Sequence, residues 1–458
     1  MTILPAALLR QLDRPGPRYT SYPTADRFHD GVSSDDYTQA LRRRGQATDA
    51  PPLSVYVHVP FCASVCYYCA CHKIVTRHHD RAAPYLQTLR REIALHREAL
   101  GRPVEVSQLH LGGGTPTFLN DDELAVLVAA LREGFAWTPD AEVSIEVDPR
   151  TASPERLAHL RRLGFNRLSF GVQDFDPAVQ AAVHREQSLQ SVQQLMEAAR
   201  ALGFESLNID LIYGLPLQTP QSVRQTVETV LVLAPDRVAL YAYAHLPERF
   251  KPQRRIDPAQ LPAAADRLAM LGGAIERFTG AGYDYIGMDH FARPDDRLAV
   301  ARREGRLHRN FMGYTTHPDS DMIGLGVSSI GSVGGLYAQN DKTLEGWTAA
   351  IEAGRFSTCR GWRLDDDDAR RRDAILALMC QGDLDTGRFE ARWGVPVTEA
   401  FASEIHDLQP LADAGLVAID PQGVHVKPLG WYAIRAIAAG FDRHLSGDQR
   451  RERFSQLV

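Results

Sequence analysis

Residues 54–73 read SVYVHVPFCASVCYYCACHK, a strand-like run that is followed at once by a cluster of cysteines. The β-branched and aromatic residues at 54–59 predict a buried strand. The cysteines of the cluster are Cys62, Cys66, Cys69 and Cys71. The whole chain of 458 residues holds only six cysteines, which is far below the density of a disulfide scaffold. The cluster therefore indicates a metal site in a reducing, cytosolic environment.

The strand-like pattern returns along the chain and predicts an α/β fold. Further strands are expected at 106–111, 143–147, 167–172, 207–212 and 238–243. Amphipathic helical patterns lie between them, for example at 85–100 and 190–203. Six β/α units at a spacing of roughly 30 residues are typical of parallel strands with crossover helices, in an open sheet, a barrel or part of a barrel. In all of these folds functional groups gather at the carboxyl ends of the strands, where the cysteine cluster lies.

Composition and charge argue against several classes of partner. The net charge of −6 and the pI near 6.2 give no electrostatic reason to expect nucleic acid. No apolar run approaches the ~18 residues that span a bilayer. The N-terminal stretch 1–19 is too short in its apolar part, and charged too soon, for a signal peptide. We therefore expect a cytoplasmic protein.

A second domain is expected to begin near residues 355–366. Four aspartates at 365–368 open a helical pattern, as the helix dipole favours. A hairpin pattern with a Pro-Gln-Gly turn follows at 415–426. This order of helices and hairpin resembles a winged helix, but the helix expected at 397–414 contains four acidic residues and no Lys or Arg, so it would repel phosphate. A packing or partner-contact module is therefore favoured over DNA binding.

The spacing of the cysteines favours an iron–sulfur cluster over zinc. Cys62, Cys66 and Cys69 form C-x3-C-x2-C, whereas structural zinc would need a second ligand pair further along. The nearby histidines, His72, His78 and His79, have no familiar zinc spacing. Three thiolates on a tight loop hold three irons of a [4Fe–4S] cube and leave the fourth iron open for a substrate or cofactor.

This motif resembles that of the radical S-adenosylmethionine (SAM) superfamily. Tyr68, directly before the third cysteine, fits that resemblance, and HLGGGTPTFL (110–119) resembles the glycine-rich loop that binds the SAM amine. The resemblance implies a partial (β/α)6 barrel and one [4Fe–4S] cluster held by Cys62, Cys66 and Cys69. The open iron would chelate SAM, whose reductive cleavage gives a 5′-deoxyadenosyl radical. The role of Cys71 stays open.

Longer stretches resemble one family within this superfamily, the oxygen-independent coproporphyrinogen III oxidases. The stretches are GPRYTSYPTADRF (16–28), CYYCACHKIVTR (66–77), NIDLIYGLP (208–216), YAHLPERFKPQRRI (243–256) and LHRNFMGYTT (307–316). The resemblance implies oxidative decarboxylation of two propionates of coproporphyrinogen III to vinyl groups, which yields protoporphyrinogen IX in haem biosynthesis. It also implies an electron donor such as a flavodoxin or ferredoxin, and a monomer.

Three alternatives remain to be weighed against this family. A haem-chaperone relative shares the cysteine motif and the glycine-rich loop, but it typically lacks the fourth cysteine and the RYTSYPT arm that are present here. An anaerobic haem-degrading relative is more distant. In a plain electron-transfer protein, Cys71 would close the fourth iron, and turnover of SAM by the reduced protein would exclude that function.

The resemblance also implies site residues and two bound SAM molecules. Positions matching the first SAM site are Tyr56, Gly113, Glu146 and Ile330. Positions matching the second are Tyr68, Gly114, Thr115, Gln173, Arg185, Asp210 and Ala244. Residues expected to act on the substrate are Tyr56, Cys71, Arg18, Tyr19, His308 and Arg309, with Lys73 as a further cation. Chemically, carboxylates such as Glu146 and Asp210 suit ribose hydroxyls, and a guanidinium suits a carboxylate.

The expected organisation is an N-terminal arm at 1–40, a catalytic domain at 41–360 and a mainly helical, winged-helix-like domain at 361–458. Gly16, Pro17 and Pro23 make the arm unsuitable for a helix or a central strand. Because the arm holds Arg18, Tyr19 and Tyr22, we expect it to close over the tetrapyrrole. The alternative is that the arm only packs against the rest of the protein.

Overall fold

The computed structural model describes residues 16–317 and 320–445. Contacts divide these residues into two compact units. The first unit consists of residues 16–27, 271–317 and 364–445, and the second of residues 28–270 and 320–363. Residues 1–15 of the expected arm and 446–458 of the expected last domain lie outside the described residues.

The contacts divide the chain at Leu364, and also at Phe28 and at Leu271, within the expected arm and the expected catalytic domain. Residues 271–317, expected in the catalytic domain, belong with the C-terminal segment because their apolar side chains share its core. Ile286, Leu298 and Tyr314 lie in one buried cluster with Ile375. The expected arm is also divided, at residue 27.

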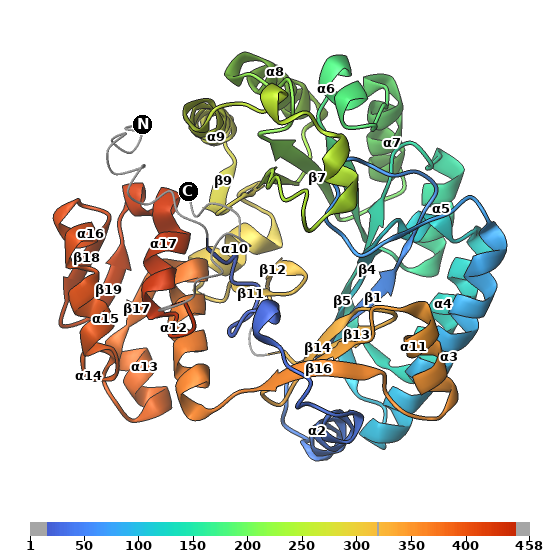
Figure 1. The fold of residues 1–458 in the computed structure, drawn as a ribbon, viewed down its shortest axis with the longest axis horizontal. Helices are drawn as coiled ribbons and strands as arrows, with labels where there is room; N and C mark the ends of the chain where they lie inside the picture. The colour runs from blue at the N-terminus through green and yellow to red at the C-terminus, as the bar shows by residue number, and fades with distance from the viewer. Residues whose placement is uncertain (1–15, 318–319, 446–458) are drawn as a thin grey trace. The chain divides into compact units, whose positions relative to one another are not determined.

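A sheet forms the centre of the second unit, and the predicted α/β class is confirmed (Figure 1). The order of its strands is β16-β15-β14-β13-β1-β4-β5-β6-β7-β8. All of the predicted strands are present, as β1 (Leu53–Val59), β4 (Glu105–Gly113), β5 (Ala136–Val147), β6 (Arg167–Gln173), β7 (Ser206–Tyr213) and β8 (Arg237–Ala242). Each pairs in parallel with its neighbour in this series, as a partial (β/α)6 barrel requires.

Further strands extend the sheet beyond β1. They are β13 (Met322–Leu325), β14 (Ile330–Val333), β15 (Leu336–Asn340) and β16 (Thr358–Arg363). β13 pairs with β1 in parallel, whereas β14, β15 and β16 follow as antiparallel neighbours. Gly334 and Gly335 both have a positive φ, which lets the chain reverse between β14 and β15. This antiparallel part was not expected from the sequence.

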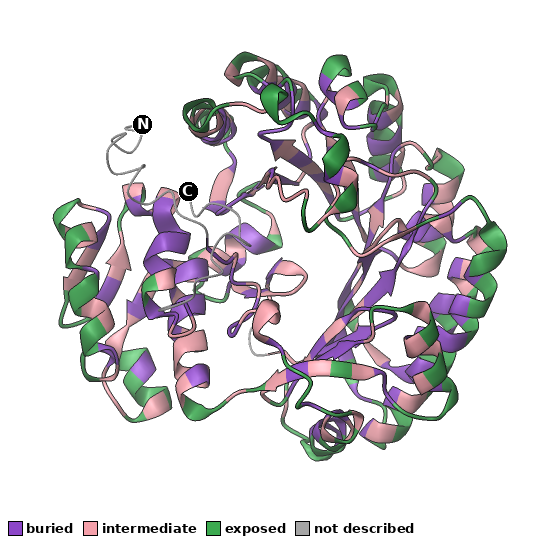
Figure 2. Cartoon of the chain, in the orientation of Figure 1, coloured by how far each residue is buried: buried purple, intermediate pink, exposed green. Residues whose placement is uncertain are grey.

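Helices connect the parallel strands and cover the outer face of the sheet (Figure 1). The helices of the second unit are α2 (Ser34–Gln46), α3 (Ala82–Leu100), α4 (Asp121–Gly134), α5 (Pro154–Leu163), α6 (Pro177–Ala182), α7 (Leu189–Ala201), α8 (Pro220–Leu233) and α11 (Leu344–Glu352), and α9 (Ala264–Gly280) crosses the division. Side chains of Asn120, Ser153, Ser188 and Thr219 accept backbone N–H groups at helix starts. Figure 2 shows buried strands and helices that are exposed on their outer sides.

Short elements complete the second unit. They are β2 (Phe61–Cys62), β3 (Ile74–Val75), η2 (His79–Arg81), η3 (Pro116–Phe118), η4 (Lys251–Arg255) and η5 (Pro258–Gln260). β2 pairs with β3 in parallel, so that the two ends of the cysteine-containing segment are held together. Among the described residues, no helix combines the length and the apolar character needed to cross a membrane.

The first unit is built from helices and short strands around one apolar core. Its elements before residue 364 are η1 (Ala25–Arg27), β9 (Asp284–Gly287), β10 (His290–Ala292), α10 (Arg297–Arg303), β11 (His308–Asn310) and β12 (Gly313–Thr315). The later elements are α12 (Asp366–Gln381), β17 (Asp383–Asp385), α13 (Thr386–Trp393), α14 (Val397–Ala400), α15 (Ala402–Asp407), α16 (Gln409–Asp413), β18 (Val417–Asp420), β19 (Gly423–Val426), η6 (Pro428–Ala433), α17 (Ile434–Ala438) and η7 (Ala439–Phe441).

The hairpin predicted at 415–426 is confirmed as β18 and β19, and β17 pairs with β19 on its other side. The helix predicted at 397–414 is wrong in its continuity, because the segment forms three short helices. Phe401 has φ −130° and ψ 37°, which is outside the helical region, and Pro410 begins a new helix. The helix predicted to begin with aspartates is confirmed as α12, whose cap is Asp365.

Candidate active site

The cysteine segment leaves β1 at its carboxyl end, as expected from the sequence. Cys62 and Cys66 are buried, Cys69 is half-buried and Cys71 is exposed. Burial thus separates Cys71 from the three cysteines of the C-x3-C-x2-C motif. Lys73 donates from Nζ to the carbonyl oxygen of Cys69 at 3.1 Å, which fixes the end of the segment.

The glycine-rich segment after β4 packs directly against the cysteines. The N–H of Gly114 donates to the carbonyl of Val59 at 2.8 Å, and that of Thr115 donates to Phe61 at 2.8 Å. A Cβ on Gly114 would lie 2.6 Å from the carbonyl oxygen of Pro60, so no larger residue fits this approach. The hydroxyl of Thr115 donates to Cys62 Sγ at 3.5 Å. The predicted loop is therefore part of the wall around the thiols.

His58 joins β1 to the cysteine segment. Its Nε2 lies 3.0 Å from the carbonyl oxygen of His72 and must donate to it, so Nδ1 accepts from the Tyr56 hydroxyl at 3.0 Å. Burial lowers the pKa of His58 to about 4, which keeps the imidazole neutral. Tyr56 stacks on His110 with ring centroids 6.0 Å apart. Tyr56 is thereby held at the carboxyl half of β1.

A row of polar side chains continues across the neighbouring strands. Glu146 accepts the N–H of Gly113 at 3.1 Å and lies 3.5 Å from His110 Nε2. Asp210 accepts from the Ser169 hydroxyl at 2.9 Å and from the Asn208 amide at 2.8 Å. Burial, followed by the charge of Glu146, raises the pKa of Asp210 to about 6. The carboxylates of Glu146 on β5 and Asp210 on β7 thus interact electrostatically, as expected of side chains on one face of a parallel sheet.

Arg185 reaches from the loop after α6 to the cysteine segment. Its Nε donates to the carbonyl oxygen of Gly171 at 3.0 Å, and its Nη1 lies 3.4 Å from Cys66 Sγ. Gln173, two residues after Gly171, has φ +74° at an irregularity in the pairing of β6 with β7. The bulge turns the end of β6, where the predicted residue Gln173 lies.

Gln253 ties two of the predicted SAM-site positions together. Its side-chain amide donates to the carbonyl oxygens of Tyr68 at 3.0 Å and Ala244 at 3.1 Å, and its Oε1 accepts the N–H of Leu246 at 2.6 Å. Gln253 itself is only 1% exposed. Ile330, the remaining predicted position in this unit, begins β14 and packs its backbone against Gly324.

The remaining expected substrate residues lie in the first unit. Arg18 forms an ion pair with Asp289. Tyr19 is 1% exposed and donates to Asp442 at 3.0 Å, and Tyr22 is fully buried in the same core. The rings of both tyrosines therefore pack inside this unit in the described conformation, which supports the packing alternative for them.

His308 and Arg309 follow one another in β11. The guanidinium of Arg309 lies 4.6 Å from the centre of the Tyr314 ring. Arg309 is 3% exposed, and its Nε and Nη1 have no hydrogen-bond partner among the described residues. A buried guanidinium with unsatisfied donors is uncommon, because it costs free energy unless an acceptor is supplied.

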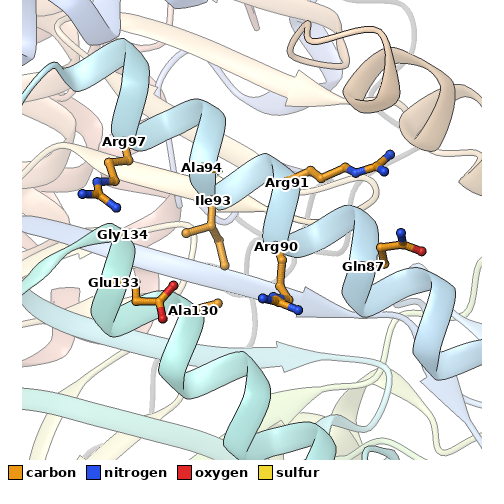
Figure 3. Close-up of a pocket in the computed structure, with 9 residues that line it drawn as sticks. All are labelled: Gln87, Arg90, Arg91, Ile93, Ala94, Arg97, Ala130, Glu133 and Gly134. Atoms are coloured by element: carbon orange, nitrogen blue, oxygen red, sulfur yellow. The ribbon is translucent and has the colours of Figure 1, made fainter.

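Cavities lie on two sides of the second unit. One of about 390 Å³ lies beside the cysteine segment and is lined by Ala63, Ser64, Thr115, Thr117, Phe118, Asp148, Arg150 and Thr151. Another of about 360 Å³ lies between α3 and α4, and Figure 3 shows Arg90, Arg97 and Glu133 around it. Because these helices form the outer layer, the second cavity does not belong to the carboxyl-edge site.

Two family models and several relatives match the chain. A model of the radical SAM superfamily matches residues 56–230, and a model of the HemN C-terminal domain matches residues 364–433. The fold and the site thus define a radical SAM enzyme.

The relatives are more specific. An oxygen-independent coproporphyrinogen III oxidase of Pseudomonas aeruginosa is 46% identical over 455 residues, which cover 99% of this chain and 98% of the relative. The enzyme of that name from Escherichia coli is 47% identical over 452 residues, with the same coverage of 99% and 98%. The solved structure of coproporphyrinogen III oxidase from Escherichia coli has a TM-score of 0.91, 47% identity, and coverage of 96% of this chain and 99% of that one. The chain belongs to the oxygen-independent coproporphyrinogen III oxidase family.

The residues of this site fit the cofactors that this family implies, a [4Fe–4S] cluster and SAM. The three thiols of the motif share one short segment, and donors from Thr115 and Arg185 point at two of their sulfurs. Among the described residues, no three His, Cys, Asp or Glu side chains converge on one point, as a single metal ion would require. The ligands of a cube instead bind different irons.

Sequence reasoning found the thiols, the glycine-rich loop, Glu146 and Asp210, but it missed His58 and Gln253. His58 lies two residues after Tyr56 in the first predicted strand. Because residues two apart in a strand lie on the same face of the sheet, this spacing could have placed His58 beside Tyr56. Gln253 lies 185 residues from Tyr68, and nothing in its neighbourhood announces that contact.

Proposed function

We propose that this chain oxidatively decarboxylates two propionate side chains of coproporphyrinogen III to vinyl groups and so yields protoporphyrinogen IX without oxygen. The similarity over nearly the whole length of relatives with that activity in their name supports the proposal. The observation that carries it is the three-thiol segment walled by the glycine-rich loop. Each propionate loses a hydrogen atom from Cβ, then CO₂ and one electron, and the electron passes to an acceptor.

The chain's own residues prepare the site for this chemistry. When bound and reduced, the cluster and SAM supply a carbon radical that abstracts a hydrogen atom from an unactivated C–H bond. Cys62, Cys66 and Cys69 would hold the cluster, while Cys71, which is exposed, stays outside the ligand set. Neutral His58 keeps Tyr56 oriented and anchors the segment through His72, so the thiols keep fixed positions.

Two SAM molecules are part of the proposal. Tyr56, Gly113 and Glu146, linked through His58 and through the Gly113–Glu146 hydrogen bond, suit the first one together with Ile330. Positions suited to the second are Tyr68, Gly114, Thr115, Gln173, Arg185, Asp210 and Ala244. Equilibrium dialysis of reconstituted protein is expected to give two SAM per chain, and one per chain would contradict this part.

Arg309 is the cation in the first unit that best suits a substrate carboxylate. Its buried Nε and Nη1 lack hydrogen-bond partners among the described residues, and a carboxylate would supply acceptors. Arg18 is the weaker choice because Asp289 already offsets its charge. His308, the neighbour of Arg309 in β11, would contact the same part of the substrate as Arg309 does. An electron donor such as a flavodoxin or ferredoxin and a monomeric state also belong to the proposal.

The test is anaerobic reconstitution followed by incubation with SAM, a reductant and coproporphyrinogen III. The expected products are 5′-deoxyadenosine and a tetrapyrrole that has lost two CO₂ and four hydrogens, read by mass. Cleavage of SAM without any change in the tetrapyrrole, in the presence of a working reductant and electron acceptor, would contradict the proposed function and point to a haem-chaperone relative.

A further inference from the structure

The turn that follows β5 fixes Arg150 beside the cysteine segment. Oδ1 of Asp148 accepts the backbone N–H of Arg150 at 3.1 Å, and the carbonyl of Asp148 accepts the N–H of Thr151 at 3.0 Å. An aspartate that accepts the N–H two residues later closes a tight turn. Because β5 also holds Glu146, the turn lies at the carboxyl edge, on the strand that contributes to the site.

Asp148 holds two guanidinium groups at once. Arg150 donates from Nε to Oδ1 at 3.0 Å and from Nη2 to Oδ2 at 2.6 Å, and Arg185 donates from Nη1 to Oδ2 at 3.3 Å. Burial alone would raise the pKa of Asp148, but the hydrogen bonds and charges of the two arginines hold it below its usual range. Asp148 is therefore ionised, and its two-point contact sets the plane of the Arg150 guanidinium.

Both guanidinium groups reach the same sulfur. Nη2 of Arg150 lies 3.6 Å from Cys66 Sγ, and Nη1 of Arg185 lies 3.4 Å from it. Cys62 receives a neutral donor instead, the hydroxyl of Thr115. Two cations and one anion leave a net charge of +1 beside Cys66. Both guanidinium groups are thus concentrated at Cys66, whereas the cation beside Cys69 is the ammonium of Lys73.

A charge beside a cluster sulfur changes the free energy of reducing the cluster. The reduced form carries one more negative charge than the oxidised form, so hydrogen bonds from a cation stabilise the reduced form and raise the reduction potential. Arg185 is already assigned to the second SAM in the proposed function, whereas Arg150 has no other role there. The side chain of Arg150 is 21% exposed at the cavity beside Ala63 and Ser64, so solvent screens its charge only in part.

We propose that Arg150, oriented by Asp148, is a positioning residue that raises the reduction potential of the [4Fe–4S] cluster through Cys66. The inference rests on the cluster of the proposed function and not on its substrate. If Arg150 only closed the turn, its replacement would not change the reduction potential of the cluster.

The test is a redox titration of reconstituted protein followed by electron paramagnetic resonance, without SAM and without tetrapyrrole. Arg150→Gln is expected to lower the ratio of reduced to oxidised cluster about tenfold at a fixed potential, which is 59 mV for a one-electron couple. Arg150→Lys, which keeps the charge but not the fork, should fall between this variant and the wild type. The matched control is Arg156→Gln, because Arg156 pairs with Asp121 and not with a cysteine.

An unchanged potential in Arg150→Gln, or an equal shift in Arg156→Gln, would overturn the proposal. If Arg150→Gln does not assemble a cluster, Arg150→His decides. Its potential, relative to the wild type, is expected to rise as the pH falls through about 6.5, where a histidine gains its charge. An Arg150→His protein whose potential follows the wild-type pH dependence would count against the proposal. Because substrate is absent, neither result depends on the reaction catalysed.

Discussion

At the scale of single residues, the four cysteines of the cluster differ in burial and in the side-chain donors that contact them. Cys62 and Cys66 are buried and receive side-chain donors, whereas Cys71 is exposed. The thiol of Cys71 hydrogen-bonds Cys69, and this bond, together with the charge of Lys73, holds the pKa of Cys69 below its usual range, although burial opposes the shift. Cys71 thus acts on the Cys69 thiol while it is itself exposed.

The first prediction concerns these four thiols. Serine in place of Cys62, Cys66 or Cys69 is expected to abolish the charge-transfer absorption of the cluster, because each replacement removes a thiolate ligand. Cys71→Ser is expected to keep most of the absorption and is the matched control. The measurement is iron content and visible absorption after anaerobic reconstitution. Equal loss in all four variants would contradict the three-ligand site.

Glu92 in α3 is a second residue whose role depends on burial. It is fully buried, and its carboxylate accepts from the N–H of Gly326 at 2.7 Å and from the amide of Asn340 at 2.6 Å. Tyr85 donates to the carbonyl of His58 at 2.6 Å nearby. The segment after β13 is thereby held against the end of β1, close to the cysteines.

The second prediction is a pH dependence of stability due to Glu92. Burial raises its pKa from 4.5 to about 7, although its hydrogen bonds oppose the shift. The folded state therefore binds the proton more tightly than the unfolded state, so its contribution is fully present below pH 4.5 and is lost as the pH rises through 7. The loss amounts to about 3 kcal/mol.

Denaturant unfolding of the wild type and of Glu92→Gln at about pH 5 and about pH 8 checks this. The wild type is expected to lose more free energy of unfolding between the two values than the variant does. Glu98→Gln is the control, because Glu98 is exposed in the last turn of the same helix. An identical pH dependence in Glu92→Gln and the wild type would contradict the prediction.

The sequence predicts such residues only where the chemistry is local. The cysteine spacing, the three adjacent glycines and the strand-end carboxylates are visible in short windows. Glu92 and Gln253 are not, because their partners lie 234 to 248 and 185 residues away. Their burial depends on how strands far apart in the chain pair, which no window contains.

At the scale of elements, the segments after the strands are tied to one another as well as to the sheet. The segment after β8 is held to the cysteine segment by the amide of Gln253, which reaches Tyr68 and Ala244. The predicted strands and helices were confirmed because their patterns are long and regular. The prediction of one continuous helix at 397–414 was wrong, because the acidic pattern of this segment does not indicate the break at Phe401.

The third prediction follows from Gln253. Gln253→Ala is expected to lower the free energy of unfolding by ~1–3 kcal/mol, since buried carbonyls lose their donor. It is also expected to weaken SAM binding, because Tyr68 and Ala244 lose their common anchor. Thermal unfolding and dialysis with SAM measure the two effects. Gln260→Ala, at an exposed position of η5, is the control and should change neither quantity.

At the scale of the whole molecule, the first unit is assembled from three separate stretches of the chain. The arm enters its core through Tyr19 and Tyr22, and Arg435 donates to the carbonyl oxygen of Pro17 at 3.0 Å. The sequence predicted that the arm closes over the tetrapyrrole, with packing against the rest of the protein as the alternative, and it did not indicate the core in which Tyr19 and Tyr22 lie. Within that core the Tyr19 hydroxyl donates to Asp442, which lies 423 residues further along the chain.

The fourth prediction measures this long-range contact. Tyr19→Phe is expected to cost ~1–3 kcal/mol of stability, because a buried carboxyl group loses a donor. In a double-mutant cycle with Asp442→Asn, the two costs are expected not to add, since the residues share one hydrogen bond. Chemical unfolding of the four proteins provides the measurement. Strict additivity would show that Tyr19 acts by packing alone.

The contact between Tyr19 and Asp442 also has a consequence for synthesis on the ribosome. Residues 28–270 emerge early and hold all the parallel strands from β1 to β8, so their pairing begins while the chain is growing. The arm emerges first but finds its core only after residue 442. At about 5–20 residues per second, its aromatic rings wait roughly 20–80 seconds without their native partners. A chaperone that shields apolar segments of the nascent chain should therefore be crosslinked at the arm until the last segment has left the ribosome.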